Sequence, residues 1–207
     1  MRIYFSNQGN LRYFGHFVQR LDFDNPKKLE IFTDERWVNV HPAHLVLTAA
    51  LANKVGKENS EIISNVPESA RYLDRMGLYN FVKTPSPFGS YEHKDPSGRF
   101  IPITIIKNSS DQSHFITEMV PLLHLGENDT STIKYIMGEL VRNVLEHAYT
   151  DSGAIVAAQY FKNTNRISLA ICDAGIGLWK GLKIWHPKTD EDAIQLALTP
   201  GISGTTR

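Results

Sequence analysis

The sequence lacks the features that would tie the chain to a membrane, to nucleic acid or to an oxidising compartment. It contains a single cysteine, Cys172, so no internal disulfide can form. No apolar run approaches the ~20 residues needed to cross a bilayer, and the N-terminal segment MRIYFSNQGN has no signal-peptide core. Lys plus Arg and Asp plus Glu number 22 each, without the basic excess typical of nucleic-acid binders. These absences predict a cytoplasmic protein that binds neither membranes nor nucleic acid.

Metal-thiolate and reactive-thiol chemistry also find little support. Cys172 falls inside an expected strand, which favours core packing over a reactive thiol. His41 and His44 are close enough in sequence to be considered as a metal pair. No third ligand is evident, so the sequence predicts no zinc site there.

The composition is that of an ordinary globular protein, and the length suits one large domain or two small ones. The chain has 207 residues, of which 42% are hydrophobic and 21% charged. Proline and glycine crowd into the stretch KTPSPFGSYEHKDPSG, which is typical of a connector. We therefore expect a small α/β domain over residues 1–84, a connector and strand over 85–110, and a second domain over 111–207.

The first domain is expected to alternate strands and helices. Residues 29–32 and 37–40 are short strand candidates on either side of a turn-like segment. His41-Pro42 then opens a helix that Gly56 ends, because proline is tolerated in a first helical turn and glycine favours a helix end. A strand over residues 62–66 and a helix from Pro67 to Gly77 complete the expected order.

The second half is expected to combine helices with a hairpin. Residues 101–106 form a strand in which Pro102 favours an edge position or a strand start, and a helix covers about 112–124. The next helix begins near Asp129 or Thr130, which are both good N-caps. Two strands then follow, over residues 153–161 and 166–172, joined by a hairpin loop at 162–165.

The helix after residue 129 carries three polar residues at a spacing of four, within GELVRNVLEHAY. Glu139, Asn143 and His147 share one side of the helix, away from its apolar stripe. An amide oxygen such as that of Asn143 suits Mg²⁺. Glu139 can orient or deprotonate a nucleophile that attacks a γ-phosphate, and His147 can donate to a phosphate oxygen.

An acidic glycine turn follows the hairpin, where the chain reads Asp173-Ala174-Gly175-Ile176-Gly177. Asp173 can accept a hydrogen bond from an exocyclic amine, which selects adenine over guanine. Gly175 and Gly177 let the backbone lie close to a base and sugar. Each pattern alone also suits a solvated helix face or a simple turn. Together, in the order helix, hairpin, glycine turn, they predict a Mg-ATP site.

At these residues the chain resembles the GHKL ATPase superfamily, which includes gyrases, heat-shock chaperones and histidine kinases. Residues 139–147 are similar to its N-box and residues 173–177 to its first glycine box, in the style of anti-sigma-factor serine kinases. The resemblance covers roughly residues 112–207. It implies the Bergerat fold, an α+β two-layer sandwich of helices on a mixed sheet. It also implies Mg-ATP binding, with Asn143 on the metal, and a homodimer.

The chain departs from the family pattern after the glycine turn. Residues 179–206 resemble the family's lid and the approach to its second glycine box, which makes Gly204 and Thr205 candidate nucleotide-binding residues. The sequence stops at Arg207, so the resemblance implies an incomplete phosphate cradle. We expect such a chain to bind ATP weakly and to turn it over slowly or not at all.

The first domain is similar to the STAS domains of anti-sigma-factor antagonists, in its strand–helix order and in its ending at Tyr72–Leu78. Those antagonists carry a phosphorylated serine at the start of a helix. Here that place reads His41-Pro42-Ala43-His44, without a hydroxyl, so docking to a protein is expected rather than phosphorylation.

Two functions follow as hypotheses. The first is an ATP-binding regulatory protein that hydrolyses ATP or phosphorylates a partner protein on serine or threonine. The alternative is a nucleotide-gated protein-binding module without turnover. Under both, the partner is a protein, such as a STAS-type or sigma-factor-like regulator. A DNA-processing ATPase is disfavoured by the neutral charge.

Overall fold

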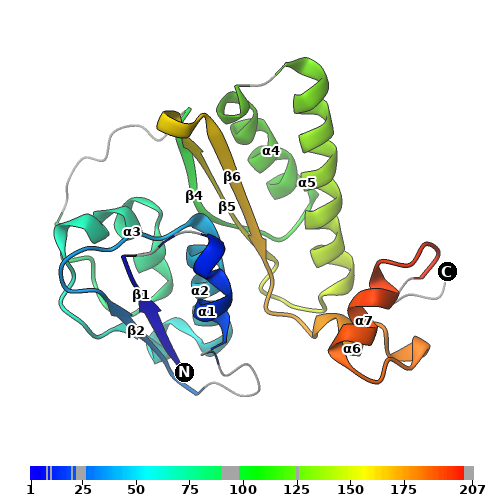
Figure 1. Cartoon of the computed structure of the whole chain (residues 1–207), viewed down its shortest axis with the longest axis horizontal. Helices are drawn as coiled ribbons and strands as arrows, with labels where there is room; N and C mark the ends of the chain where they lie inside the picture. Colours follow the sequence, from blue (N-terminus) through cyan, green and yellow to red (C-terminus); the bar gives the residue numbers. More distant parts are fainter. Residues whose placement is uncertain are drawn as a thin grey trace.

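The computed structural model of the chain describes residues 1–7, 9, 11–19, 21, 27–89, 98–124 and 126–202. Within these residues the fold is α+β, with two small sheets and seven α-helices (Figure 1). None of the helices in these ranges combines the length and the apolar character needed to span a membrane.

The first sheet is parallel and three-stranded, in the order β1-β2-β3. Its strands are β1 (Arg2–Phe5), β2 (Leu29–Thr33) and β3 (Ser60–Ile62). The helices of this half are α1 (Phe14–Val18), α2 (Pro42–Val55) and α3 (Arg71–Arg75). Two expected elements are present as β2 and α2. The strand predicted over residues 62–66 is misplaced, because β3 ends at Ile62, and β1 was not predicted.

Helix α2 begins and ends where the sequence predicts. His41 is its N-cap and accepts from the backbone N–H of Ala43 at 3.2 Å, while His44 accepts from the N–H of His41 at 3.3 Å. This reciprocal capping box satisfies two backbone donors of the first turn. Gly56 takes a positive φ of 94° at the other end, which suits glycine best.

The strand predicted over residues 37–40 is wrong. The segment lies outside both sheets because its backbone donors have other partners. The N–H of Val38 donates to the Ser69 hydroxyl at 2.8 Å, and that of Asn39 donates to the Ser6 carbonyl at 3.1 Å. The helix predicted from Pro67 is a 3-10 turn, Glu68–Ala70, followed by the short α3, and Gly77 ends it in the left-handed region.

The second sheet is antiparallel, in the order β4-β5-β6. It contains β4 (Phe100–Ile106), β5 (Ala154–Phe161) and β6 (Arg166–Cys172). Of the two positions predicted from Pro102, the edge is confirmed, because among the described strands β4 pairs with β5 alone, with a register shift between Ile101 and Thr104. Ile103 instead donates its N–H to the carbonyl of Met76, at 2.9 Å. The predicted hairpin joins β5 to β6.

Two helices, α4 (Ser109–Leu123) and α5 (Glu127–His147), cover one face of this sheet (Figure 1). Buried residues of both helices and of the sheet form one apolar cluster, which includes Phe115, Met119, Val141 and Val156. The predicted N-caps of α5 are wrong. The helix begins at Glu127 after Gly126, so that Asp129 lies inside its first turn, where a negative charge complements the helix dipole.

Helix α2 covers the opposite face of the same sheet, against β5 and β6 (Figure 1). Helix α2 is therefore buried both where it faces the first sheet and where it faces the second. This explains why apolar residues occur all around the helix. A second apolar cluster runs from the first sheet through α2 to residues such as Ile155 and Ala170 of the second. The second sheet thus has helices on both faces, one layer more than the predicted two-layer sandwich.

After β6 the chain forms α6 (Gly177–Gly181), a 3-10 turn at Lys183–Trp185 and α7 (Asp190–Ala197). Helices α6 and α7 pack on each other beside the C-terminal end of α5 (Figure 1). The Trp179 indole N–H donates to the Pro187 carbonyl at 3.0 Å. Thr189 caps α7 in a capping box with Asp192. This segment is the one the sequence predicts as a lid.

Candidate functional site

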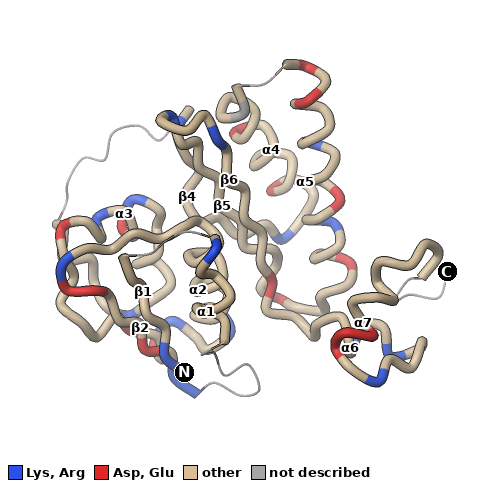
Figure 2. Tube along the Cα trace, viewed as in Figure 1, with Lys and Arg blue, Asp and Glu red and all other residues tan. Residues whose placement is uncertain are grey.

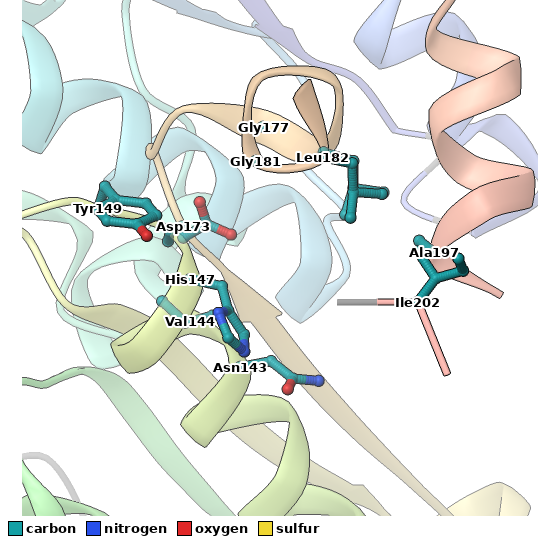
Figure 3. Close-up of a pocket in the computed structure, with 12 residues that line it drawn as sticks. Asn143, Val144, His147, Tyr149, Asp173, Gly177, Gly181, Leu182, Ala197 and Ile202 are labelled. Atoms are coloured by element: carbon teal, nitrogen blue, oxygen red, sulfur yellow. The ribbon is translucent and has the colours of Figure 1, made fainter. Parts of the chain in front are cut away.

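A cavity of about 360 Å³ lies where the C-terminal end of α5 meets the segment after β6. Helix α5 supplies one wall, and the α6–α7 segment supplies the other (Figure 3). The lining residues are Asn143, Val144, His147, Ala148, Tyr149, Asp173, Gly177, Leu178, Gly181, Leu182, Ala197 and Ile202. Four of the residues predicted for the site, Asn143, His147, Asp173 and Gly177, therefore face one cavity.

The turn after β6 is fastened to the end of α5. The N–H of Ile176 donates to the carbonyl of Ala148 at 3.0 Å. A Cβ added at Gly175 would lie 2.0 Å from the same oxygen, so only glycine permits this approach. Gly175 does not line the cavity, and its close approach is to α5. Gly177 does line it, with a positive φ of 75°.

The carboxylate of Asp173 is exposed and held by its own turn. One oxygen, Oδ1, accepts from the N–H of Gly175 at 2.8 Å. This bond fixes the direction of the side chain and leaves acceptor capacity on Oδ2. Figure 3 shows the carboxylate directed towards the segment of α6 that carries Gly177 and Gly181, and Tyr149 lines the same cavity.

His147 lies one turn after Asn143 on the cavity side of α5 (Figure 3). Its Nδ1 is buried without a hydrogen-bond partner among the described residues. Nε2 is then the ring nitrogen that can meet a ligand, as a donor when it carries the proton. The Glu146 carboxylate lies 3.8 Å from Nε2, beyond good hydrogen-bond distance. The Asn143 amide is exposed and offers both a donor and an acceptor.

Glu139, the predicted base, does not line this cavity. Its carboxylate forms an ion pair with Arg142, one turn of α5 before the cavity. Hydrogen bonding to that carboxylate, and then its charge, raise the pKa of Arg142 above its ordinary value. Figure 2 shows acidic and basic residues alternating along α5, so this pair belongs to a mixed-charge surface. Gly204 and Thr205, also predicted for the site, lie outside the described residues.

Sequence reasoning missed the aromatic and apolar part of the cavity. Tyr149 lies directly after the end of α5 in the left-handed region, at a φ of 49°, and is 65% exposed. Leu182 is buried, and Ala197 and Ile202 come from the far side of the lid (Figure 3). The position of Tyr149, two residues after the last polar residue of the helix, was the available signal.

The sequence raised two metal sites, Mg²⁺ at Asn143 and a pair formed by His41 and His44, and the structure bears differently on each. No group of three or more His, Cys, Asp or Glu side chains gathers within the described ranges. Mg²⁺ commonly uses one or two protein oxygens together with phosphates and waters, so the single amide of Asn143 fits that ion. His41 and His44 are occupied by the capping box of α2, and His41 also bonds to Ser168 at 2.9 Å.

Cys172 packs against the core cluster, as predicted. Burial raises the pKa of its thiol to about 12, which keeps it protonated at neutral pH and unreactive.

Comparisons of the chain with protein-family models, with curated proteins and with solved structures found no match. The chemistry of the cavity is therefore what bears on its function.

Proposed function

We propose that the cavity binds Mg-ATP and that the chain is an ATP-binding regulatory protein of the histidine-kinase-like class, with a Bergerat-type arrangement of α4 and α5 on the second sheet. One observation carries the proposal: Asn143 and His147 of α5 face the same cavity as Asp173 from the end of β6. The cavity volume of about 360 Å³ falls within the range of roughly 300–1,000 Å³ typical of small-molecule sites.

Asp173 gives the cavity its preference for adenine. Because Oδ1 is taken by the N–H of Gly175, Oδ2 is the oxygen that accepts from the exocyclic amine of the base. Guanine presents a carbonyl oxygen at the corresponding position, and two acceptors facing each other repel. A charge-assisted bond of this kind favours ATP over GTP.

His147 and Asn143 serve the phosphate end. The Nε2–H of His147 donates to a phosphate oxygen, and the amide oxygen of Asn143 is the protein ligand of Mg²⁺. Bound Mg²⁺ would neutralise phosphate charge. The lid segment, with Leu182 and Ala197 on its inner side, keeps water from the base.

Replacing Asp173 tests the proposal. In Asp173→Asn, we expect ATP affinity to fall by roughly 10- to 100-fold, equivalent to ~1.5–3 kcal/mol for one charge-assisted bond. Isothermal titration with and without Mg²⁺ measures the effect, and Asp151→Asn, which changes an exposed aspartate outside the cavity, is the matched control. The proposal fails if the unchanged chain shows no Mg-dependent ATP binding, or if both variants bind alike.

The alternative, a nucleotide-gated protein-binding module without turnover, is favoured by the ion pair of Glu139 with Arg142. A general base must reach the attacking group, and a carboxylate held by Arg142 outside the cavity does not. Phosphate release by the unchanged chain, Glu139→Ala and Arg142→Ala separates the two functions. An enzyme loses turnover in Glu139→Ala while ATP binding persists. A gated module shows the same background release in all three proteins.

The first sheet and α2 are proposed as a STAS-like docking unit for a protein regulator. Its parallel strands and the capping of α2 by His41 support this role, because the start of α2 offers no hydroxyl for phosphorylation. The homodimer and the protein partner remain predictions.

A further inference from the structure

A second cavity, of about 230 Å³, lies beside β1 in the first half of the chain. It is formed by the edge strand β1, the region of α1 and the first turn of α2, and it shares no residue with the proposed nucleotide site. Its lining residues are Arg2, Tyr4, Phe5, Ser6, Gly9, Tyr13, His16, Phe17, Asn39, Val40 and His44.

The floor of this cavity is aromatic. Phe5 is buried and stacks on Phe17, with ring centroids 6.2 Å apart and planes at 10°. Phe17 meets the ring of His44 edge-on, at 4.7 Å and 71°. Tyr4 and Tyr13, which are half exposed, stand at the rim. Such walls favour a flat ring, because aromatic pairs gain from offset and edge-on packing beyond the area they bury.

His44 supplies a buried, neutral ring. The residue is only 5% exposed, and burial, followed by the nearby His41, lowers the pKa of its ring to about 4. The ring is therefore neutral at pH 7. Its Nδ1 accepts from the N–H of His41, so the proton lies on Nε2. His44 lines the cavity, so its uncharged ring forms part of the cavity wall.

The cavity has a basic residue at its edge. Among the described residues that line it, Arg2 is present and no Asp or Glu is. The Nε of Arg2 donates to Glu30 at 3.1 Å, but a guanidinium carries further N–H donors that remain for a carboxylate. Aromatic walls, a buried neutral imidazole and a basic rim together define one kind of ligand.

We propose that this second cavity binds a small aromatic carboxylate, with its ring on the floor formed by Phe5, Phe17 and His44 and its carboxylate at the basic rim near Arg2. The site makes the first half of the chain a sensor of a small metabolite rather than a docking surface alone. It is independent of nucleotide binding, and its failure leaves the Mg-ATP proposal untouched.

Three probes test the ligand class by two-dimensional amide NMR of the full chain without ATP. Indole-3-acetate has the ring and the charge, indole-3-acetamide has the ring alone, and cyclohexylacetate has the charge alone. We expect indole-3-acetate to shift the amide signals of Ser6, Gly9 and Asn39 with a dissociation constant on the order of 1 mM, and the other two probes to bind at least about fivefold more weakly.

Matched variants locate the site. Arg2→Gln and Tyr13→Leu change rim residues and should each weaken binding of indole-3-acetate by about fivefold or more. Arg36→Gln and Tyr135→Leu, which change exposed residues outside the cavity, should leave it unchanged. The same spectra report whether each variant is folded, and either rim variant alone decides the outcome. No saturable shift below roughly 20 mM, equal binding of the neutral amide, or equal effects of rim and control variants would overturn the proposal.

Discussion

Gly175 joins the two halves of the candidate nucleotide site. The sequence suggests that its lack of a side chain admits a nucleotide, but the close contact it permits is with the carbonyl of Ala148 at the end of α5. This contact sets the distance between α5 and the turn that carries Asp173. The position of one carboxylate therefore depends on a packing contact that the ligand does not touch.

Gly175→Ala should destabilise the chain by ~1–3 kcal/mol, because a Cβ 2.0 Å from the Ala148 oxygen forces the turn away from the helix. Gly181→Ala is the control, since a Cβ there meets nothing within 4 Å. Urea unfolding measures both variants. Equal midpoints for the two would contradict the role given to Gly175.

Tyr149 is expected to form the aromatic wall for the base. Because it lines the cavity beside Asp173, Tyr149→Ala should weaken ATP binding by about 1–3 kcal/mol, the usual value for loss of one base–aromatic stack. Tyr149→Phe keeps the ring and should bind like the unchanged chain. Isothermal titration distinguishes the two, and a loss of affinity in Tyr149→Phe would assign the effect to the hydroxyl instead.

At the scale of elements, the burial of His44 in the first turn of α2 makes stability depend on pH. The unfolded chain protonates His44 near its ordinary pKa of 6.5, whereas burial lowers the pKa in the folded chain to about 4. Between these values the unfolded state binds more protons. The stabilisation is therefore complete above pH 6.5 and is lost as the pH falls towards 4.

Urea unfolding at pH 7 and pH 4.5 should show this loss, on the order of 1–3 kcal/mol. In His44→Gln, which does not titrate, the difference between the two pH values should shrink by that amount. His114→Gln removes an exposed histidine and should keep the full difference. An unchanged pH dependence in His44→Gln would show that another group carries it.

The elements that the sequence predicts well are those whose signals are local. Proline and histidine at the start of α2, glycine at its end, and the loop between β5 and β6 each act within a few residues. The strand predicted at residues 37–40 is absent because its backbone N–H groups donate to Ser69 and Ser6. Both partners lie far from this segment in the sequence. Pairing partners of that kind leave no local pattern.

The candidate site divides in the same way. A spacing of four residues suffices to bring Asn143 and His147 to one side of α5, and a strand end suffices to expose Asp173. The same spacing does not say that Arg142 holds Glu139. Nor does it say that Ala197 and Ile202 close the far wall, since their position depends on how the lid folds back.

At the scale of the whole molecule, α2 belongs to both halves. It lies against β5 and β6 on one side and belongs to the core of the first sheet on the other. His41 at its start bonds to Ser168 of β6, and Tyr72 of α3 bonds to Gln159 of β5. Because this apolar cluster is continuous and has hydrogen bonds at its border, we expect the chain to unfold as one unit rather than as two domains.

Leu73→Ala tests this expectation. Leu73 is fully buried in the cluster of the first half, and its truncation should cost ~2–5 kcal/mol. If the halves unfold together, native-state hydrogen exchange will show the slowest amides of β2 and of β5 losing the same free energy of protection. Leu198→Ala, which changes a side chain that is 80% exposed, should alter neither. A loss confined to β2 would mean that the second sheet and its helices stand alone, and that α2 only rests on them.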